Sequence, residues 1–179
     1  MGLRRILEIL HIVKPIDYNS VEFLRSRGVK IGENVDILNS LIDGCHGFLI
    51  SIGNNVTITG ARLLAHDGST KKFLGYSKVG RIDIGNDVFV GQGAIILPNT
   101  KIGNRVIIGA GCVVGKNIPD NSVVIGNPCQ ILCSFDEYIE KNKKRLEEGP
   151  VYETIFSKKT NEEKDRMYNE LNGRIRFDV

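Results

Sequence analysis

The sequence predicts a mainly β fold in which six-residue repeats wind into a three-sided prism, with helical segments at both ends. Six β-branched residues recur at every sixth position, namely Ile84, Val90, Ile96, Ile102, Ile108 and Val114. Glycine directly follows each of them except Ile96, and a compact or β-branched residue comes four positions later. A helix would space its apolar residues three and four apart, and an ordinary strand does not continue through so many glycines. Each hexad therefore supplies one short strand and one corner, and three hexads complete a coil of about 18 residues whose parallel strands stack about 4.8 Å apart.

The composition excludes several classes of protein. With 179 residues, 41% hydrophobic and 25% charged, the chain can bury a core, and it has no apolar run long enough for an integral membrane segment. Its net charge of 24 − 21 = +3 argues against a nucleic-acid partner. The four cysteines form no C-x-x-C pair, so we expect reduced thiols and a cytoplasmic location. The 20 glycines should hold corners where a Cβ would not fit or where φ is positive.

The chain divides into three parts: an N-terminal helical cap over 1–28, the repeat domain over 29–130 and a C-terminal helical tail over 131–179. In the cap we expect a short amphipathic helix over 2–13, for which a weak peripheral membrane contact stays open. A second helix over 20–27 begins at Ser20, a capping residue, and ends at Gly28. In the tail, two helices start at capping boxes, Ser134 with Glu137 and Thr160 with Glu163.

The repeat register extends upstream of the regular hexads, with two interruptions. The same pattern includes Ile31, Ile37, Ile52, Ile58 and Leu64. From Ile37 to Ile52 is 15 residues, two hexads plus three, which indicates a small irregularity. From Leu64 to Ile84 is 20 residues, one hexad plus fourteen, which predicts a loop insertion over about 65–81. Loops on a rigid scaffold are frequent sites of function.

The clearest hexads are I-G-N-D-V-F, V-G-Q-G-A-I and I-G-N-R-V-I, and they lead into I-G-A-G-C-V-V-G-K-N-I-P and G-N-P-C. These motifs resemble the hexapeptide-repeat acyltransferases, and most of all their galactoside- and maltose-type sugar O-acetyltransferases. The resemblance is strong over about 84–130 and weaker back to Ile31. It implies a left-handed parallel β-helix, acetyl-CoA as acyl donor, no metal, and a homotrimer with active sites between subunits. The period alone does not indicate the hand of the coil.

Three histidines are candidates for chemistry, and they differ in position. His11 lies in the expected N-terminal helix, and His46 lies at the first irregularity, where turn packing explains it. His66 opens the predicted loop insertion. The resemblance implies that His66 is the general base, and an imidazole pKa near 6.5 suits proton removal from a hydroxyl at neutral pH. The acceptor would attack the thioester directly, without an acyl-enzyme.

The resemblance also implies which residues contact the donor. The backbone N–H of Gln92 would bind the thioester oxygen. The residues that the resemblance implies for contact with CoA are Phe89, Ala110, Lys116, Asn127 and Pro128. Relatives often carry a basic residue where this chain has Gln130. Cys112 falls at an inward repeat position, which predicts a core residue rather than a nucleophile.

Asp67 follows His66 directly and could orient its ring or bind the acceptor. Neighbouring side chains on an extended segment point apart, so another carboxylate or a backbone carbonyl could orient the imidazole instead. The sequence leaves these choices open.

The function that these features favour is acetyl transfer from acetyl-CoA to a hydroxyl of a sugar or glycan. N-acetylation of a nucleotide-linked amino sugar would use the same base, and a non-catalytic structural solenoid is the third alternative. Serine acetylation is less favoured, because relatives with that activity carry a larger N-terminal helical domain. A γ-type carbonic anhydrase needs three zinc-binding histidines, and His11 lies outside the repeats.

Overall fold

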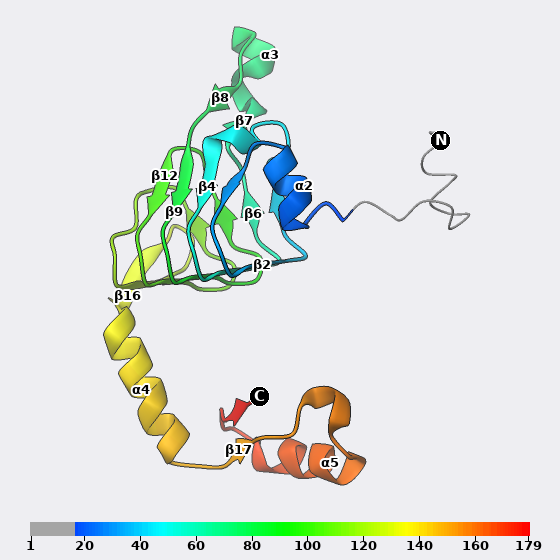
Figure 1. The fold of residues 1–179 in the computed structure, drawn as a ribbon. Helices are drawn as coiled ribbons and strands as arrows, with labels where there is room; N and C mark the ends of the chain where they lie inside the picture. Colours follow the sequence, from blue (N-terminus) through cyan, green and yellow to red (C-terminus); the bar gives the residue numbers. More distant parts are fainter. Residues whose placement is uncertain (1–16) are drawn as a thin grey trace, which may run out of the picture. The chain divides into compact units, whose positions relative to one another are not determined.

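Three parallel sheets form the faces of the repeat domain (Figure 1). The structure, a computed structural model, describes residues 17–179, so the expected helix over 2–13 and His11 lie outside the described residues. The first sheet contains β1 (Lys30–Ile31), β4 (Ile50–Ile52), β9 (Ile82–Ile84) and β12 (Thr100–Ile102). The second contains β2 (Val35–Leu38), β5 (Val56–Thr59), β10 (Val88–Val90), β13 (Val106–Ile108), β15 (Ser122–Ile125) and the antiparallel β16 (Gln130–Ser134). The third contains β3 (Leu41–Ile42), β6 (Arg62–Leu63), β11 (Ile95–Ile96) and β14 (Val113–Val114).

The chain visits the three sheets in a fixed rotation, and strand pairing confirms the 18-residue coil. Each paired position lies one coil further along the chain, as in Ile84 with Ile102, Val90 with Ile108 and Ile96 with Val114. All six of these side chains are buried, together with the residues four positions after each of them. The predicted interior is therefore confirmed, and Cys112 belongs to it. Burial also raises the pKa of the Cys112 thiol to about 11, so this cysteine is not a nucleophile.

The two predicted interruptions of the register are present and leave the prism at the same edge. Ile52 pairs with Ile84, a separation of 84 − 52 = 32 residues, which is one coil plus fourteen. Ile31 pairs with Ile52, a separation of 21 residues, which is one coil plus three. Both extra segments lie between a strand of the third sheet and the next strand of the first sheet. We call this side of the prism the insertion edge.

The structure corrects one predicted core position. Leu63, not Leu64, is fully buried and pairs with Ile96. In the first two coils along the chain, the corner between the second and third sheets is one residue shorter than in the later coils. The Ser40 hydroxyl bridges these two short corners, because it accepts from the Ala61 N–H at 3.1 Å. Leu64 is consequently displaced outward and only partly buried.

The larger insertion is a hairpin that projects from the prism (Figure 1). It comprises β7 (His66–Asp67), the short 3-10 helix η2 (Gly68–Thr70), α3 (Lys71–Leu74) and β8 (Lys78–Val79). Strands β7 and β8 pair antiparallel, and the Gly80 N–H donates to the carbonyl of the buried Ala65 at 2.9 Å. The smaller irregularity contains the 3-10 helix η1 (Gly47–Leu49). At the N-terminal end, α2 (Val21–Ser26) is capped by Ser20 as predicted and buries Leu24 in the core.

Glycines at the corner between the first and second sheets permit a very close backbone approach. A Cβ on Gly53 would lie 2.5 Å from the Gly85 carbonyl oxygen, and a Cβ on Gly85 would lie 2.6 Å from that of Gly103. The following asparagines link the same coils, because Asn54 N–H donates to Asn86 Oδ1 and Asn86 N–H donates to Asn104 Oδ1. Glycine occurs at these hexad positions because there is no room for a Cβ. Positive φ at this corner falls on other residues, namely Asn34, Asn55, Asp87, Arg105 and Asn121.

Residues 136–179 form a separate compact unit. Its first element is α4 (Phe135–Glu147), whose first residue comes just before the unit begins. The others are β17 (Val151–Tyr152), the 3-10 helix η3 (Phe156–Lys158), α5 (Asn161–Glu170) and β18 (Phe177–Asp178). The predicted capping box of Thr160 and Glu163 is present. The buried ammonium of Lys159 donates to the Thr154 carbonyl and to Asp178. Within the part of the chain that the structure describes, no helix combines the length and the apolar character needed to cross a membrane.

We expect Gly85→Ala to lower the free energy of unfolding by about 1–3 kcal/mol, because the added methyl meets backbone that cannot move aside. Gly115→Ala is the matched control, since the nearest atom to its Cβ is the flexible end of Leu97 at 3.2 Å. Urea unfolding of both variants measures the difference. Equal stabilities would show that close approach at the corner is not the reason for glycine there.

Candidate active site

His66 is fixed to the prism at the insertion edge. It is the first residue of β7 and directly follows Ala65, which belongs to the core. Its backbone pairs with Val79 on the returning strand. The imidazole is partly exposed, with 40% of its side-chain surface accessible, so it can meet a substrate while its backbone is held by the fold.

Asp43, which the sequence did not single out, orients the His66 ring. Its side chain is only 2% exposed, and its Oδ2 accepts a hydrogen bond from His66 Nδ1. The other carboxylate oxygen accepts from the backbone N–H groups of Cys45 at 3.0 Å and His46 at 3.1 Å. Burial alone would raise the pKa of Asp43, but the hydrogen bonds from His66 and from the His46 backbone bring it below its ordinary value.

This pairing sets the tautomer of the imidazole. An ionised carboxylate can only accept a hydrogen bond, so Nδ1 of His66 carries the proton that it donates to Asp43. A neutral ring then has its lone pair on Nε2. The arrangement therefore leaves Nε2 as the ring nitrogen that can accept a proton.

His46, for which turn packing was the interpretation from sequence, lies beside this pair. Its ring centroid is 4.8 Å from that of His66, with a tilt of 38°. Its Nδ1 is 3.7 Å from Asp43 Oδ1. One potential ligand atom from each of Asp43, His46 and His66 lies within 4.8 Å of the other two, so these are the described residues that could together hold a metal ion.

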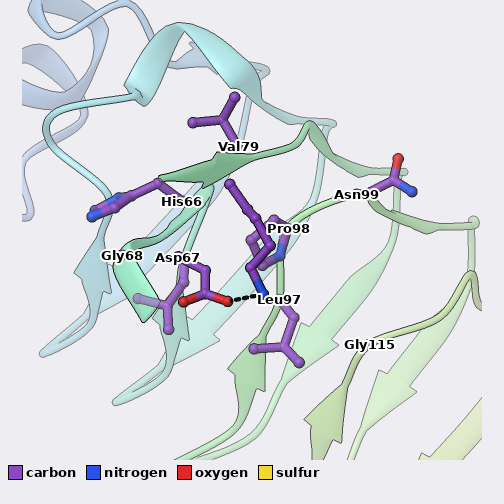
Figure 2. A pocket seen from close by; sticks show the side chains of 10 residues that line it. His66, Asp67, Gly68, Val79, Leu97, Pro98, Asn99 and Gly115 are labelled. Atoms are coloured by element: carbon purple, nitrogen blue, oxygen red, sulfur yellow. Dashed lines mark ion pairs between the residues drawn. The ribbon is translucent and has the colours of Figure 1, made fainter. Parts of the chain in front are cut away.

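Asp67 takes no part in orienting His66. The two side chains point to opposite sides of β7, as neighbours on a strand do (Figure 2). Asp67 forms an ion pair with Lys78 at 2.5 Å and accepts from the Ser69 N–H at 2.8 Å. The hydrogen bond from Lys78 lowers the pKa of Asp67 to about 2, so this carboxylate is ionised at neutral pH. Asp43, not Asp67, therefore orients the His66 ring. Binding of the acceptor is the other role that the sequence left open for Asp67.

A groove of about 710 Å³ lies beside β7 at the insertion edge (Figure 2). The hairpin contributes Asp67 and Lys78, and the displaced Leu64 lines it as well. Its other walls come from the next two coils, through Leu97, Pro98 and Gly115. The exposed Lys116 follows Gly115 at this edge. The groove thus offers a mostly apolar lining with one charged pair.

The predicted donor contacts divide between two edges of the prism. Lys116 lies at the insertion edge, as His66 does. The exposed Gln92 and Ala110 lie one coil apart at the corner between the second and third sheets. The Gln92 carbonyl accepts from the Gly111 N–H at 2.8 Å, and among residues 17–179 no backbone hydrogen bond is donated by Gln92. One described chain therefore does not bring the predicted base and the predicted oxyanion donor to the same edge.

The remaining predicted contacts are exposed and adjoin the second sheet. Phe89 points outward from β10 and is 43% exposed. Asn127 and Pro128 lie in the turn between β15 and β16, joined by a cis peptide bond. Gln130 begins β16.

Comparisons with known proteins agree with this architecture. Residues 81–116 match the model of the bacterial transferase hexapeptide family, which has six repeats. Protein CapG of Staphylococcus aureus is 43% identical over 131 residues, which is 68% of this chain and 75% of CapG. YvoF of Bacillus subtilis (strain 168) is 37% identical over 100 residues, 55% of each protein.

Two solved structures are also similar. The hexapeptide-repeat-containing acetyltransferase VCA0836 from Vibrio cholerae aligns with a TM-score of 0.53 and 26% identity, over 60% of this chain and 63% of that one. A maltose O-acetyltransferase from Clostridium difficile 630 aligns with a TM-score of 0.50 and 26% identity, over 73% of this chain and 83% of that one. The chain thus matches the hexapeptide-repeat model, aligns with three quarters of CapG and is similar to these two acetyltransferase structures. It therefore belongs to the hexapeptide-repeat acetyltransferases.

Proposed function

We propose that this enzyme transfers the acetyl group of acetyl-CoA to a hydroxyl of a sugar or glycan, with His66 as general base. The observation that carries the proposal is the hydrogen bond between His66 and the buried Asp43, which leaves Nε2 free to accept a proton. Acetyl-CoA is the donor that membership of the family implies. A sugar hydroxyl as acceptor is supported by the similarity to a maltose O-acetyltransferase.

The reaction needs one proton acceptor and one oxyanion donor. His66 Nε2 removes the proton of the acceptor hydroxyl while the hydroxyl oxygen attacks the thioester carbonyl carbon. The negative charge that develops on the carbonyl oxygen is stabilised by the Gln92 N–H. When the carbon–sulfur bond breaks, the imidazolium returns its proton to the CoA thiolate. The products are an acetyl ester and CoA, and Asp43 stabilises the imidazolium in between.

The division of these residues between two edges supports a homotrimer with active sites between subunits. In a closed ring of three copies, the insertion edge of one subunit can face the Gln92 and Ala110 corner of the next. Lys116 at the insertion edge and the outward Phe89, Asn127 and Pro128 would then complete the donor site. Within such a trimer the coils of each subunit would wind left-handed, as the resemblance implies.

Replacing His66 with Ala should lower kcat by about 10²- to 10⁴-fold, because the general base is lost. The measurement is CoA release from acetyl-CoA with a panel of sugars, glycans and amino sugars as acceptors. Binding of acetyl-CoA, followed by calorimetry, should stay close to the wild-type value. Lys72→Ala, an exposed position on α3 of the same hairpin, is the matched control. Turnover above a few per cent of wild type in His66→Ala would remove this residue from the base role.

Replacing Asp43 with Asn should lower kcat by about tenfold or more while the KM for acetyl-CoA changes little, since the ring loses its charged partner. Nitrogen-15 NMR of the His66 ring reports the tautomer, and we expect the Nδ1–H form to lose its dominance. Asp67→Asn is the control, because that carboxylate faces the other side of β7 and should leave the tautomer unchanged. A wild-type tautomer and rate in Asp43→Asn would contradict the orienting role.

Mixing two inactive variants tests the shared site. His66→Ala lacks the base, and Ala110→Trp should fill the space for the pantetheine arm at the exposed corner. Random reassembly of equal amounts should restore about a quarter of wild-type activity, because three quarters of the trimers are mixed and each mixed trimer has one intact site of three. No recovery from subunits shown to have exchanged would mean that each site lies within one chain.

A further inference from the structure

The imidazole of His46 lies beside the proposed base, but the acetyl transfer above does not use it. Its Nδ1 is buried and has no hydrogen-bond partner among the described residues. Asp43 Oδ1 is 3.7 Å from this nitrogen, beyond hydrogen-bond range. Buried polar atoms are nearly always satisfied in folded proteins, so an unpaired ring nitrogen in this position needs an explanation.

Both imidazoles direct their Nδ1 atoms at one carboxylate. His66 Nδ1 contacts Oδ2 of Asp43, and His46 Nδ1 faces Oδ1. The His46 backbone N–H also donates to Oδ1 at 3.1 Å, which holds these two residues in place relative to each other. The cluster therefore offers two nitrogen donors and one oxygen donor around a common point.

We propose that Asp43, His46 and His66 bind a transition-metal ion, with Zn²⁺ as the preferred occupant. Zinc–nitrogen and zinc–oxygen bonds of about 2.0–2.2 Å place tetrahedral ligands roughly 3.4 Å apart. The three ligand atoms already lie within 4.8 Å of one another, so small side-chain rotations suffice. Two imidazoles and a carboxylate form a donor set that suits zinc, and water or a substrate group takes the fourth position.

The bound ion would switch off the base, an inference that rests on the function proposed above. A metal bound at Nδ1 of His66 takes the lone pair there, so the single proton of the neutral ring moves to Nε2. Nε2 then donates a hydrogen bond and cannot accept the proton of the acceptor hydroxyl. Zinc would thus act as a reversible inhibitor through the tautomer of one ring.

The metal site is tested by calorimetric titration of the full chain with Zn²⁺ in a buffer free of thiols. We expect one ion per chain, and His46→Gln should weaken binding by about tenfold or more. Cys45→Ser is the matched control, because this exposed thiol lies in the same segment and is a possible competing ligand. It should leave the affinity unchanged. Affinity that is insensitive to His46→Gln, or that disappears in Cys45→Ser, would overturn the site.

The inhibitory effect has its own readouts. Zinc should abolish acetyl transfer by the wild-type enzyme, and chelation should restore it, whereas His46→Gln should keep its own zinc-free rate at the same zinc concentration. Nitrogen-15 NMR should show the proton of the His66 ring moving to Nε2 as zinc binds. If zinc binds through His46 without loss of transfer, the position of the His66 ring proton separates the two outcomes. A proton still on Nδ1 would overturn the inhibition alone, whereas a proton on Nε2 would overturn the base role of His66 as well.

Discussion

The close backbone approach at the glycine–asparagine corners is the constraint on which the rest of this structure depends. A coil can stack on the next only if no Cβ stands between the two backbones, and Gly32, Gly53, Gly85 and Gly103 meet that condition in successive coils. The asparagine side chains then satisfy the N–H groups that the sharp corner leaves without a strand partner. Because this corner repeats without interruption, extra residues can enter only at another edge of the prism.

That restriction explains how residues far apart in the sequence meet. The two interruptions leave from the same edge, one coil apart, so the segment after β3 lies directly beside the segment after β6. The Asp43 N–H donates to the Leu63 carbonyl at 3.0 Å, which places the carboxylate next to the start of the hairpin. Asp43 and His66 are 23 residues apart and still form a direct hydrogen bond. The regular stack thus positions the two irregular segments that contain Asp43 and His66.

The predictions from sequence succeeded where the period is strict and failed where it is not. Spacing alone indicated the inward residues from Ile84 to Val114 and the loop insertion that begins near His66. The core position in this coil was predicted at Leu64, one residue beyond the true position at Leu63, because nothing in the pattern reveals the shorter corner that Ser40 bridges. Asp43 was missed for a related reason: it lies in the first interruption, where no repeat assigns a direction to a side chain. A search of both interruptions for carboxylates would have found it.

The burial of Asp43 explains why it, and not the adjacent Asp67, controls His66. A buried carboxylate is unstable unless its oxygens receive hydrogen bonds, and here the backbone groups of Cys45 and His46 supply two of them independently of any substrate. The third comes from His66, so the ring has a fixed partner before a substrate arrives. Asp67 is more exposed and is satisfied by Lys78, a flexible surface side chain that water can replace. The tautomer of His66 is therefore set by the fold of the insertion edge, whereas the ion pair of Asp67 and Lys78 is open to solvent.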